Sequence, residues 1–253
     1  MNLYLENKRV LITGGSKGLG KGIAKLFLEE GASVGICGRS QETLEQAKSE
    51  LDGELIILKG DVTSREDRER IIREFIGEFG GIDILINNAG GSNGSSVMET
   101  SMEEFEEAVH LNFLSAVGMS KLAAEYMVKN EKGTIINISS IFGRESGGKP
   151  TYNGSKAALI SFTKSFADEM IQHGVRISGV APGSVLHPTG NWQKRLKENP
   201  EQINQYVQQH IPAQRFGTVE EIANTVVFLS SDRASWVIGA TLNVDGGQSY
   251  SNF

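Results

Sequence analysis

The chain has 253 residues, a formal net charge of −6 and no cluster of Lys and Arg, which argues against nucleic acid as a partner because phosphate neutralisation needs grouped cations. No segment approaches the roughly 20 apolar residues of a membrane span, and the N-terminus lacks a basic region followed by a long apolar core, so no membrane association is expected. The prolines and glycines are spread out without a linker or low-complexity tract, which favours one domain over residues 1–253.

Short apolar, β-branched runs alternate with longer amphipathic stretches along the chain. Strands are predicted at 9–13, 33–37, 55–59, 83–87, 134–139, 175–181 and 240–245. These runs are nearly continuous in Val, Ile and Leu, as expected of strands buried on both faces. Between them the pattern predicts helices, for example at 21–31 and 65–80, with an apolar stripe on one side. Strand then helix, repeated, predicts right-handed crossovers and a doubly wound α/β fold with a parallel sheet.

A glycine-rich turn, TGGSKGLG at 13–20, follows the first predicted strand directly. Glycines at 14, 18 and 20 allow a tight turn, close approach of the backbone to a diphosphate, and close packing of the next helix on the strand. Such glycine motifs also arise by accident. Here the order of strand, turn and helix is the required one, so the turn predicts a dinucleotide site.

The end of the second predicted strand should decide which dinucleotide binds. An acidic side chain there would accept hydrogen bonds from a ribose 2′-hydroxyl, but the chain has Gly38 and Arg39. A guanidinium suits a 2′-phosphate, and Lys17 in the glycine turn would add a second positive charge. We therefore expect NADP(H) over NAD(H). In the alternative interpretation Arg39 is a solvated residue that opens the next helix, and both cofactors are tolerated.

The only cysteine, Cys37, lies in the apolar run SVGICG. It has no partner for an internal disulfide and is expected to pack as a small buried hydrophobe, which suits a reducing compartment. We therefore expect a cytoplasmic protein. No Cys, His and Asp grouping has the spacing of metal ligands, so no metal is expected.

Two further segments depart from ordinary helix and strand patterns. In TYNGSKAALISF, at 151–162, Tyr152 and Lys156 are four residues apart and share one helix face, a pair that also arises by chance. Residues 184–217 hold three of the five prolines and many polar side chains. This insertion is interpreted either as a mobile lid or substrate wall, or as a solvated helical excursion. After it, Thr218 and Glu221 predict a capping box.

Taken in order, these motifs resemble the short-chain dehydrogenase/reductase family. The resemblance rests on TGGSKGLG, NNAG at 87–90, the asparagine of HLN at 110–112, a serine ending INISS, YNGSK, and APG at 181–183. It covers nearly the whole chain. It implies a single Rossmann domain with a seven-stranded parallel sheet in the order 3-2-1-4-5-6-7, a substrate lid after the sixth strand, and a homotetramer.

The resemblance also implies a catalytic set of Asn112, Ser139, Tyr152 and Lys156. Tyr152 would protonate the alkoxide left by hydride transfer, and the ammonium of Lys156, with the oxidised nicotinamide ring, would lower the pKa of the phenol. Lys156 would also reach the nicotinamide ribose, and Ser139 would hold the substrate oxygen beside the tyrosine. Asn112, in a helix predicted over 101–130, would displace a backbone bond and seat a water touching Lys156. Otherwise Ser139 caps a strand and Asn112 kinks a helix.

Other residues are implied as cofactor contacts. They are Gly14, Ser16, Lys17, Gly18, Leu19, Gly20 and Arg39 at the phosphates, Asp61 and Val62 at the adenine, Asn88, Ala89 and Gly90 at the central portion, and Pro182, Gly183 and Val185 with Tyr152 and Lys156 at the nicotinamide end. Asn87 is expected to stabilise the sheet. The chain departs from the family pattern at His187, which takes the place of a threonine near the carboxamide, with Thr189 two residues on. A loop histidine beside Pro188 is expected to be a packing or surface residue.

The activity implied is an NADP(H)-dependent interconversion of a ketone and a secondary alcohol. The substrate is a small carbonyl or alcohol compound, with 3-oxoacyl thioesters as one class and sugars, steroids or other small alcohols, using NAD(H) or both cofactors, as alternatives. Its wall is expected from 90–96, from 141–151 and from the insertion. Arg144 is expected to pair with Glu145 or a neighbouring subunit, and the alternative is contact with an anionic group of the substrate. A non-catalytic dinucleotide sensor has no need of Ser139, Tyr152 and Lys156 together. An extended sugar epimerase would need more chain after Gly183.

Overall fold

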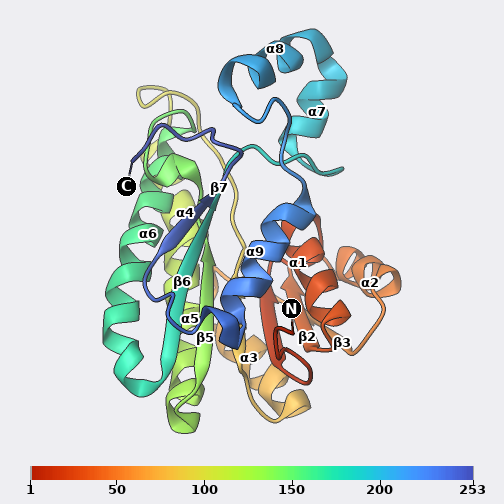
Figure 1. Ribbon diagram of the computed structural model, residues 1–253. Coiled ribbons are helices and arrows are strands. Elements are labelled where there is room, and N and C mark those ends of the chain that lie inside the picture. Colours follow the sequence, from red (N-terminus) through yellow and green to blue (C-terminus); the bar gives the residue numbers. More distant parts are fainter. Residues whose placement is uncertain (1, 253) are drawn as a thin grey trace.

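The computed structural model describes residues 2–252 and contains a parallel sheet with helices on both faces (Figure 1). Its strands are β1 (Arg9–Thr13), β2 (Ser33–Gly38), β3 (Leu55–Lys59), β4 (Ile84–Asn87), β5 (Gly133–Ile138), β6 (Val175–Pro182) and β7 (Thr241–Val244). They lie in the order β3-β2-β1-β4-β5-β6-β7, and each neighbouring pair is parallel. The predicted fold class and strand order are confirmed.

The α-helices are α1 (Gly18–Glu29), α2 (Gln41–Glu50), α3 (Arg65–Phe79), α4 (Met102–Val109), α5 (Ser115–Met127), α6 (Pro150–Met170), α7 (Asn191–Glu198), α8 (Pro200–His210) and α9 (Val219–Ser230). At least one α-helix lies between each pair of successive strands, with α4 and α5 after β4 and α7 to α9 after β6. None of the helices within residues 2–252 is both long enough and apolar enough to cross a bilayer.

The sheet separates two apolar cores because successive side chains of a strand point to opposite faces. On β1, Val10 and Ile12 belong to the core under α1, α2 and α9, whereas Leu11 belongs to the core under α3, α5 and α6. All three side chains are fully buried, and each contributes about 1.5–3 kcal/mol to stability. Cys37 is also fully buried, and burial raises the pKa of its thiol to about 12, which confirms its predicted packing role.

The helix predicted over 101–130 is not one continuous α-helix. A π-helical turn, His110–Leu114, separates α4 from α5, and a 3₁₀ turn follows at Val128–Asn130. Within the π-helical turn, Asn112 Nδ2 donates to the carbonyl oxygen of Ala108 at 3.0 Å. An inserted side-chain donor of this kind disturbs the regular backbone ladder, and π-helical turns are frequent at functional sites.

The insertion at 184–217 forms α7 and α8, which extend beyond the carboxyl ends of the strands (Figure 1). Its base is closed by two backbone hydrogen bonds, from Leu186 N to Gly217 O at 3.0 Å and from Gly217 N to Ser184 O at 3.0 Å. The predicted capping box follows, since Glu221 N donates to Thr218 Oγ1 at 3.2 Å and Thr218 N to Glu221 Oε2 at 2.8 Å. The insertion therefore leaves and re-enters the fold at neighbouring residues.

Candidate active site

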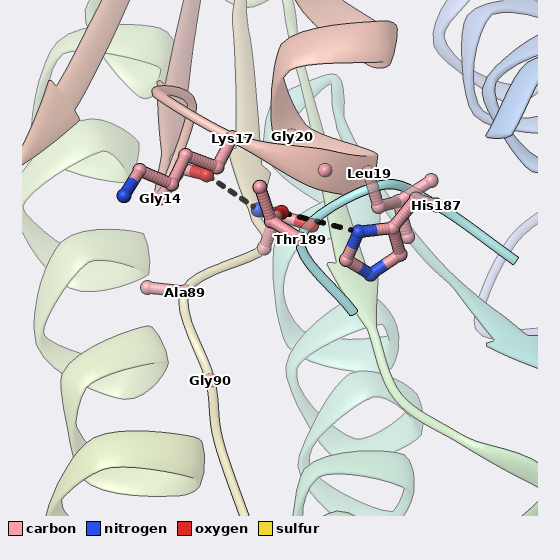
Figure 2. Close-up of a pocket in the computed structure, with 10 residues that line it drawn as sticks. Gly14, Lys17, Leu19, Gly20, Ala89, Gly90, His187 and Thr189 are labelled. Atoms are coloured by element: carbon pink, nitrogen blue, oxygen red, sulfur yellow. Dashed lines mark hydrogen bonds between the residues drawn. The ribbon is translucent and has the colours of Figure 1, made fainter. Parts of the chain in front are cut away.

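The glycine-rich turn between β1 and α1 packs closely on the segment after β4 (Figure 2). Gly14 and Gly18 have φ values of 64° and 51°, a region that favours glycine. A Cβ at Gly20 would lie 2.3 Å from Gly14 O and 2.5 Å from Asn88 Nδ2. Asn88 Nδ2 donates to the carbonyl oxygens of Thr13, at 3.0 Å, and of Gly14, at 3.1 Å. These contacts fix the turn and require glycine at position 20.

A cavity of about 210 Å³ opens at the start of α1. It is lined by Gly14, Lys17, Gly18, Leu19, Gly20, Asn88, Ala89, Gly90, His187 and Thr189. The N-cap residue Lys17 provides no side-chain cap, so the first backbone N–H groups of the helix are available to a ligand. Bare glycines, uncapped N–H groups and one ammonium fit an anionic diphosphate.

Replacing Gly20 by Ala is expected to destabilise the protein by about 1–3 kcal/mol, because the new methyl group meets backbone and a bonded amide. Binding of NADPH, the coenzyme that the sequence predicts, should weaken by about tenfold or more, since about 1.4 kcal/mol corresponds to a factor of ten. Chemical denaturation and fluorescence titration measure the two effects.

The control for Gly20→Ala is Gly77→Ala. Gly77 lies inside α3, and a Cβ there meets nothing within 4 Å. This variant should be stabilised by about 0.5–1 kcal/mol through helix propensity, with unchanged NADPH affinity. Equal behaviour of the two variants would contradict the role assigned to the turn.

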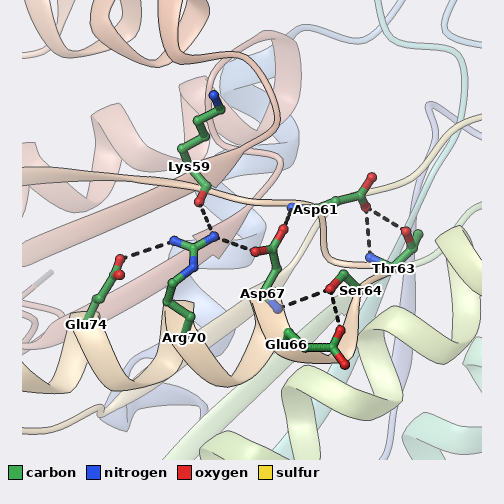
Figure 3. A network of polar contacts seen from close by, with 8 residues as sticks. All are labelled: Lys59, Asp61, Thr63, Ser64, Glu66, Asp67, Arg70 and Glu74. Carbon is green, nitrogen blue, oxygen red and sulfur yellow. Dashed lines mark hydrogen bonds and ion pairs between the residues drawn. The ribbon is translucent and has the colours of Figure 1, made fainter.

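A second cavity, of about 670 Å³, lies beyond the turn, between the ends of β2 and β3 and the helix α4. Its lining includes Arg39, Asp61, Thr63 and three glutamates of α4. The Asp61 carboxylate accepts from Thr63 N at 2.9 Å and from Thr63 Oγ1 at 2.8 Å, and Asp61 N donates to Asp67 at 2.8 Å (Figure 3). The neighbouring Val62 is buried. Hydrogen bonds and burial therefore hold the turn that carries Asp61 and Val62 in place.

Arg39 is exposed at the rim of this second cavity, and within residues 2–252 it forms no hydrogen bond or ion pair. Ser16 of the glycine-rich turn lies next to Gly38, the residue before Arg39. A Cβ added at Gly38 would be 3.4 Å from Ser16 Oγ. The guanidinium is thus free to bind an anion close to the glycine-rich turn.

The Tyr–Lys pair lies near the start of α6. Lys156 Nζ is 5.6 Å from the centroid of the Tyr152 ring and donates to Ile138 O at 2.7 Å. Lys156 is only 3% exposed, and burial lowers the pKa of its ammonium to about 8. Burial raises the pKa of the Tyr152 phenol, whereas a hydrogen bond with the Ser140 side chain lowers it. The predicted proximity of the phenol and the ammonium is confirmed.

The serine beside the tyrosine is Ser140, whereas the sequence predicted Ser139. Ser139 continues the β5–β6 pairing, with its N–H donating to Val180 O at 2.7 Å, and its hydroxyl donates to Lys156 O at 3.1 Å. Ser140 follows in an extended conformation, so its side chain points the opposite way and lines a cavity together with Tyr152. The two serines are consecutive in the sequence. Because side chains of an extended chain alternate between two faces, this alternation was the signal that could have distinguished Ser140 from Ser139.

Asn112 connects the π-helical turn with the segment after β4. Its Nδ2 donates to Gly91 O at 2.9 Å, and its Oδ1 accepts from Gly91 N at 2.9 Å. A Cβ at Gly90 would lie 2.8 Å from Asn112 Oδ1 and 3.4 Å from Lys156 Nζ. Glycine at position 90 therefore lets the amide and the ammonium approach the same point. The water that the sequence analysis placed between them stays a prediction.

The cavity that Tyr152 lines has a volume of about 1050 Å³. Phe142, Gly183 and the loop 147–150 form part of its wall, and Trp192 and Tyr206 of the insertion form another part. The Trp192 and Tyr206 rings are 4.7 Å apart, and the Tyr206 hydroxyl accepts from Gln248 Nε2 at 3.0 Å. The insertion thus contributes a wall of this cavity, as one of the two sequence interpretations held.

Comparison with known proteins identifies the chain's relatives. A family model described as enoyl-(acyl carrier protein) reductase matches residues 14–249. A 3-oxoacyl-[acyl-carrier-protein] reductase of Chlamydia muridarum is 36% identical over 252 residues, covering 98% of this chain and 99% of the relative. The chain belongs to the short-chain dehydrogenase/reductase family. As such it is an oxidoreductase of the class that acts on CH–OH groups.

Two other short-chain dehydrogenases/reductases are similar over nearly their full length. A 3α-hydroxysteroid dehydrogenase of Mediterraneibacter gnavus is 37% identical, covering 97% of this chain and 98% of the relative. The crystal structure of L-sorbose reductase from Gluconobacter frateurii, complexed with NADPH and L-sorbose, has a TM-score of 0.91 and 31% identity, covering 99% of this chain and all of that one. Relatives of similar identity are thus named for different substrates.

The remaining family positions follow the end of β6 in this short-chain dehydrogenase/reductase. Pro182 ends the strand, Gly183 lines the large cavity, and Val185 pairs with Gly217. His187, expected to be a packing or surface residue, is half-buried in the cavity at the start of α1.

The sequence predicts structural roles for Asn87 and Arg144. Asn87 Nδ2 donates to Ser120 Oγ and to Asn137 Oδ1, both at 2.8 Å, which confirms its role in the sheet. Arg144 donates to Thr241 O at 2.5 Å, so its contact is structural as expected, although the partner is the β7 backbone and not Glu145.

Proposed function

We propose that this protein is an NADP(H)-dependent oxidoreductase that interconverts a ketone and a secondary alcohol. The observation that carries the proposal is the half-buried Tyr152, with Lys156 Nζ 5.6 Å from the centroid of its ring, at the wall of a large cavity. Gly183 of the same wall lies directly after β6, and the glycine-rich turn lies after β1 at the same end of the sheet. Ligands of open α/β sheets bind at this end.

In the proposed mechanism each side chain has a defined task. The reduced coenzyme, when bound, supplies a hydride to the carbonyl carbon. Tyr152 donates its proton to the carbonyl oxygen, and the Ser140 hydroxyl donates a hydrogen bond to the same oxygen. The Lys156 ammonium stabilises the phenolate that remains, because an opposite charge nearby favours the ionised form. Asn112, whose amide is bonded to Gly91 and lies near Lys156 beside Gly90, is proposed to relay the returning proton to Lys156 through a bound water.

The assignment of Ser140 predicts different outcomes for the two neighbouring serines. Ser140→Ala should lower kcat by about a hundredfold, because the substrate oxygen loses a donor in the transition state. Ser139→Ala should cost about 1 kcal/mol of stability through the lost bond to Lys156 O, with kcat changed by less than about tenfold. Initial rates of NADPH oxidation and thermal melts of both variants are the measurements. The reverse order of the two kcat values would restore Ser139 as the residue that holds substrate.

NADP(H) is proposed over NAD(H) on the charges around the turn. Arg39 and Lys17 offer two cations, and no carboxylate stands at the end of β2 to bind a ribose 2′-hydroxyl. The sorbose reductase structure that resembles this one contains NADPH, which supports the choice. The acidic side chains of α4 that line the same cavity act against a 2′-phosphate, so Arg39 has to outweigh them.

The substrate is proposed to be a 3-oxoacyl thioester, with a steroid or sugar ketone as the alternatives. The first choice follows the similar 3-oxoacyl-[acyl-carrier-protein] reductases, and the cavity of about 1050 Å³ has room for any of the three. The deciding experiment follows NADPH absorbance with acetoacetyl thioesters, a 3-ketosteroid and L-sorbose. Preference for the thioester by kcat/KM supports the first choice. Absence of NADPH oxidation with a broad carbonyl panel, despite NADPH binding, would instead support a dinucleotide sensor.

We further propose a single domain over residues 1–253, a homotetramer and a cytoplasmic location. The tetramer follows the family resemblance, and Trp236, which is 94% exposed before β7, is an apolar side chain that such an interface would cover. Light scattering of the purified protein measures the mass in solution, and a monomer would refute the tetramer.

A further inference from the structure

The cavity at the start of α1 contains an imidazole that the proposed mechanism does not use. His187, from the segment that opens the insertion, lies over the glycine-rich turn (Figure 2). A Cβ at Gly18 would be 2.8 Å from His187 Cε1 and 3.0 Å from its Nδ1. On the other side, a Cβ at Gly190 would be 2.7 Å from Nε2. The absence of side chains at both glycines admits the ring to the cavity.

Few groups compete for the ring nitrogens of His187. Nδ1 lies 3.3 Å from Thr189 Oγ1, and within residues 2–252 no carboxylate forms an ion pair with the imidazole. The ring is half-buried, and burial lowers its pKa below the ordinary value of 6.5. Without a ligand the ring is therefore mostly neutral at pH 7.

We propose that His187 binds the coenzyme's diphosphate as an imidazolium, so that coenzyme affinity rises as the pH falls. The inference rests on the proposed function, since it takes the coenzyme to bind in this cavity. The uncapped start of α1 and the glycine-rich turn bring backbone N–H groups to the diphosphate, and the imidazole of His187, which packs against Gly18, lines the same cavity. A diphosphate in this cavity, beside the ring, gains a charge-assisted hydrogen bond from the protonated imidazole.

The charged groups near His187 determine whether protonation of its ring is favoured or opposed. Lys17 of the turn is the charged side chain that shares the cavity, and it opposes protonation when no ligand is present. The other lining residues, from the turn, from the segment after β4 and from the insertion, are neutral. The diphosphate reverses this balance, because a nearby anion raises the pKa of an imidazole. Affinity is therefore high below the pKa of the free protein and falls until the pH passes the higher pKa of the complex.

The test measures dissociation constants for NADPH and NADH by fluorescence titration between pH 5.5 and 8.5. These pH limits are chosen to bracket the ordinary imidazole pKa of about 6.5. The wild type should bind both coenzymes about tenfold more weakly at the upper limit, where the neutral ring no longer offers the diphosphate a charge-assisted hydrogen bond. His187→Gln keeps an N–H donor but does not titrate, so its NADH affinity should vary by less than about twofold. The 2′-phosphate of NADPH also titrates, near pH 6, and the variant measured with the same ligand corrects for it.

Two further measurements make the test specific to this ring. His173→Gln, at an exposed position after α6, should keep the pH dependence of the wild type. In proton NMR titrations, the imidazole signal that is missing from His187→Gln should show a higher pKa with saturating NADH than without it.

The outcomes separate the two proposals. Equal pH dependence of NADH affinity in the wild type and His187→Gln would overturn the role of His187 while leaving coenzyme binding intact. An unchanged imidazole pKa on saturation with NADH would overturn it as well. Failure of the wild type to bind either coenzyme at any pH would instead refute the proposed function.

Discussion

Replacing Tyr152 by Phe is expected to lower kcat for ketone reduction by about 10²–10⁴-fold, the usual contribution of a positioned general acid. The ring of Phe fills the same space, so the wall of the cavity and the packing on α6 should persist. The dissociation constant for NADPH should therefore change little. Initial rates with saturating NADPH and a fluorescence titration measure the two quantities separately.

A second Tyr–Lys pair in the chain provides a matched control for Tyr152→Phe. Lys129 Nζ lies 5.1 Å from the centroid of the Tyr126 ring, at the end of α5 and away from the cavities of the site. Tyr126→Phe removes the same hydroxyl from a similar pair and should leave kcat within about twofold. Near-normal turnover by Tyr152→Phe would refute the role of Tyr152 as general acid. It would also refute the proposal that the protein uses the Tyr152–Lys156 pair for catalysis.

Replacing Arg39 by Asp is expected to change the ratio of kcat/KM for NADPH over NADH by about a hundredfold to a thousandfold. The variant loses a guanidinium for the 2′-phosphate and gains a carboxylate that repels it. The same carboxylate accepts hydrogen bonds from the ribose 2′-hydroxyl of NADH, so the two changes multiply. Because Arg39 forms no internal hydrogen bond or ion pair within residues 2–252, folding should be unaffected. Initial rates with each coenzyme give the ratio.

The control for Arg39→Asp is Arg73→Asp, which makes the same charge change at an exposed position of α3. Its coenzyme ratio should equal that of the wild type. An unaltered ratio in Arg39→Asp would assign the coenzyme preference to Lys17 or to another group of the turn.

The sequence predicted most of the fold because the strands are buried on both faces and read as apolar runs. Val10, Leu11 and Ile12 are all fully buried, and no alternation was needed to recognise their strand. The break between α4 and α5 could not be read in the same way. It depends on Asn112, whose amide bonds to Ala108 and Gly91, and one of these partners lies far from the helix in sequence.

The site was predictable in its residue types but not in every position. Glycine spacing located the turn after β1, and the four-residue interval located Tyr152 and Lys156. The choice between Ser139 and Ser140 depended on where β5 stops pairing with β6, and an error of one residue exchanges the two faces. His187 presented another difficulty, since its place in the cavity depends on Gly18 and Gly190 leaving space for the ring.

The narrow base of the insertion has an evolutionary consequence. Since the two bonds between Ser184, Leu186 and Gly217 close it off from the sheet, the residues between them can diverge, lengthen or be exchanged with those of a relative without disturbing strand register. Selection for a new substrate can then change α7 and α8 while the rest of the fold stays the same. Under the proposed mechanism, the chemistry at Tyr152 and Lys156 stays the same during such exchanges, which offers a physical route by which relatives named for acyl groups, steroids and sugars share one fold.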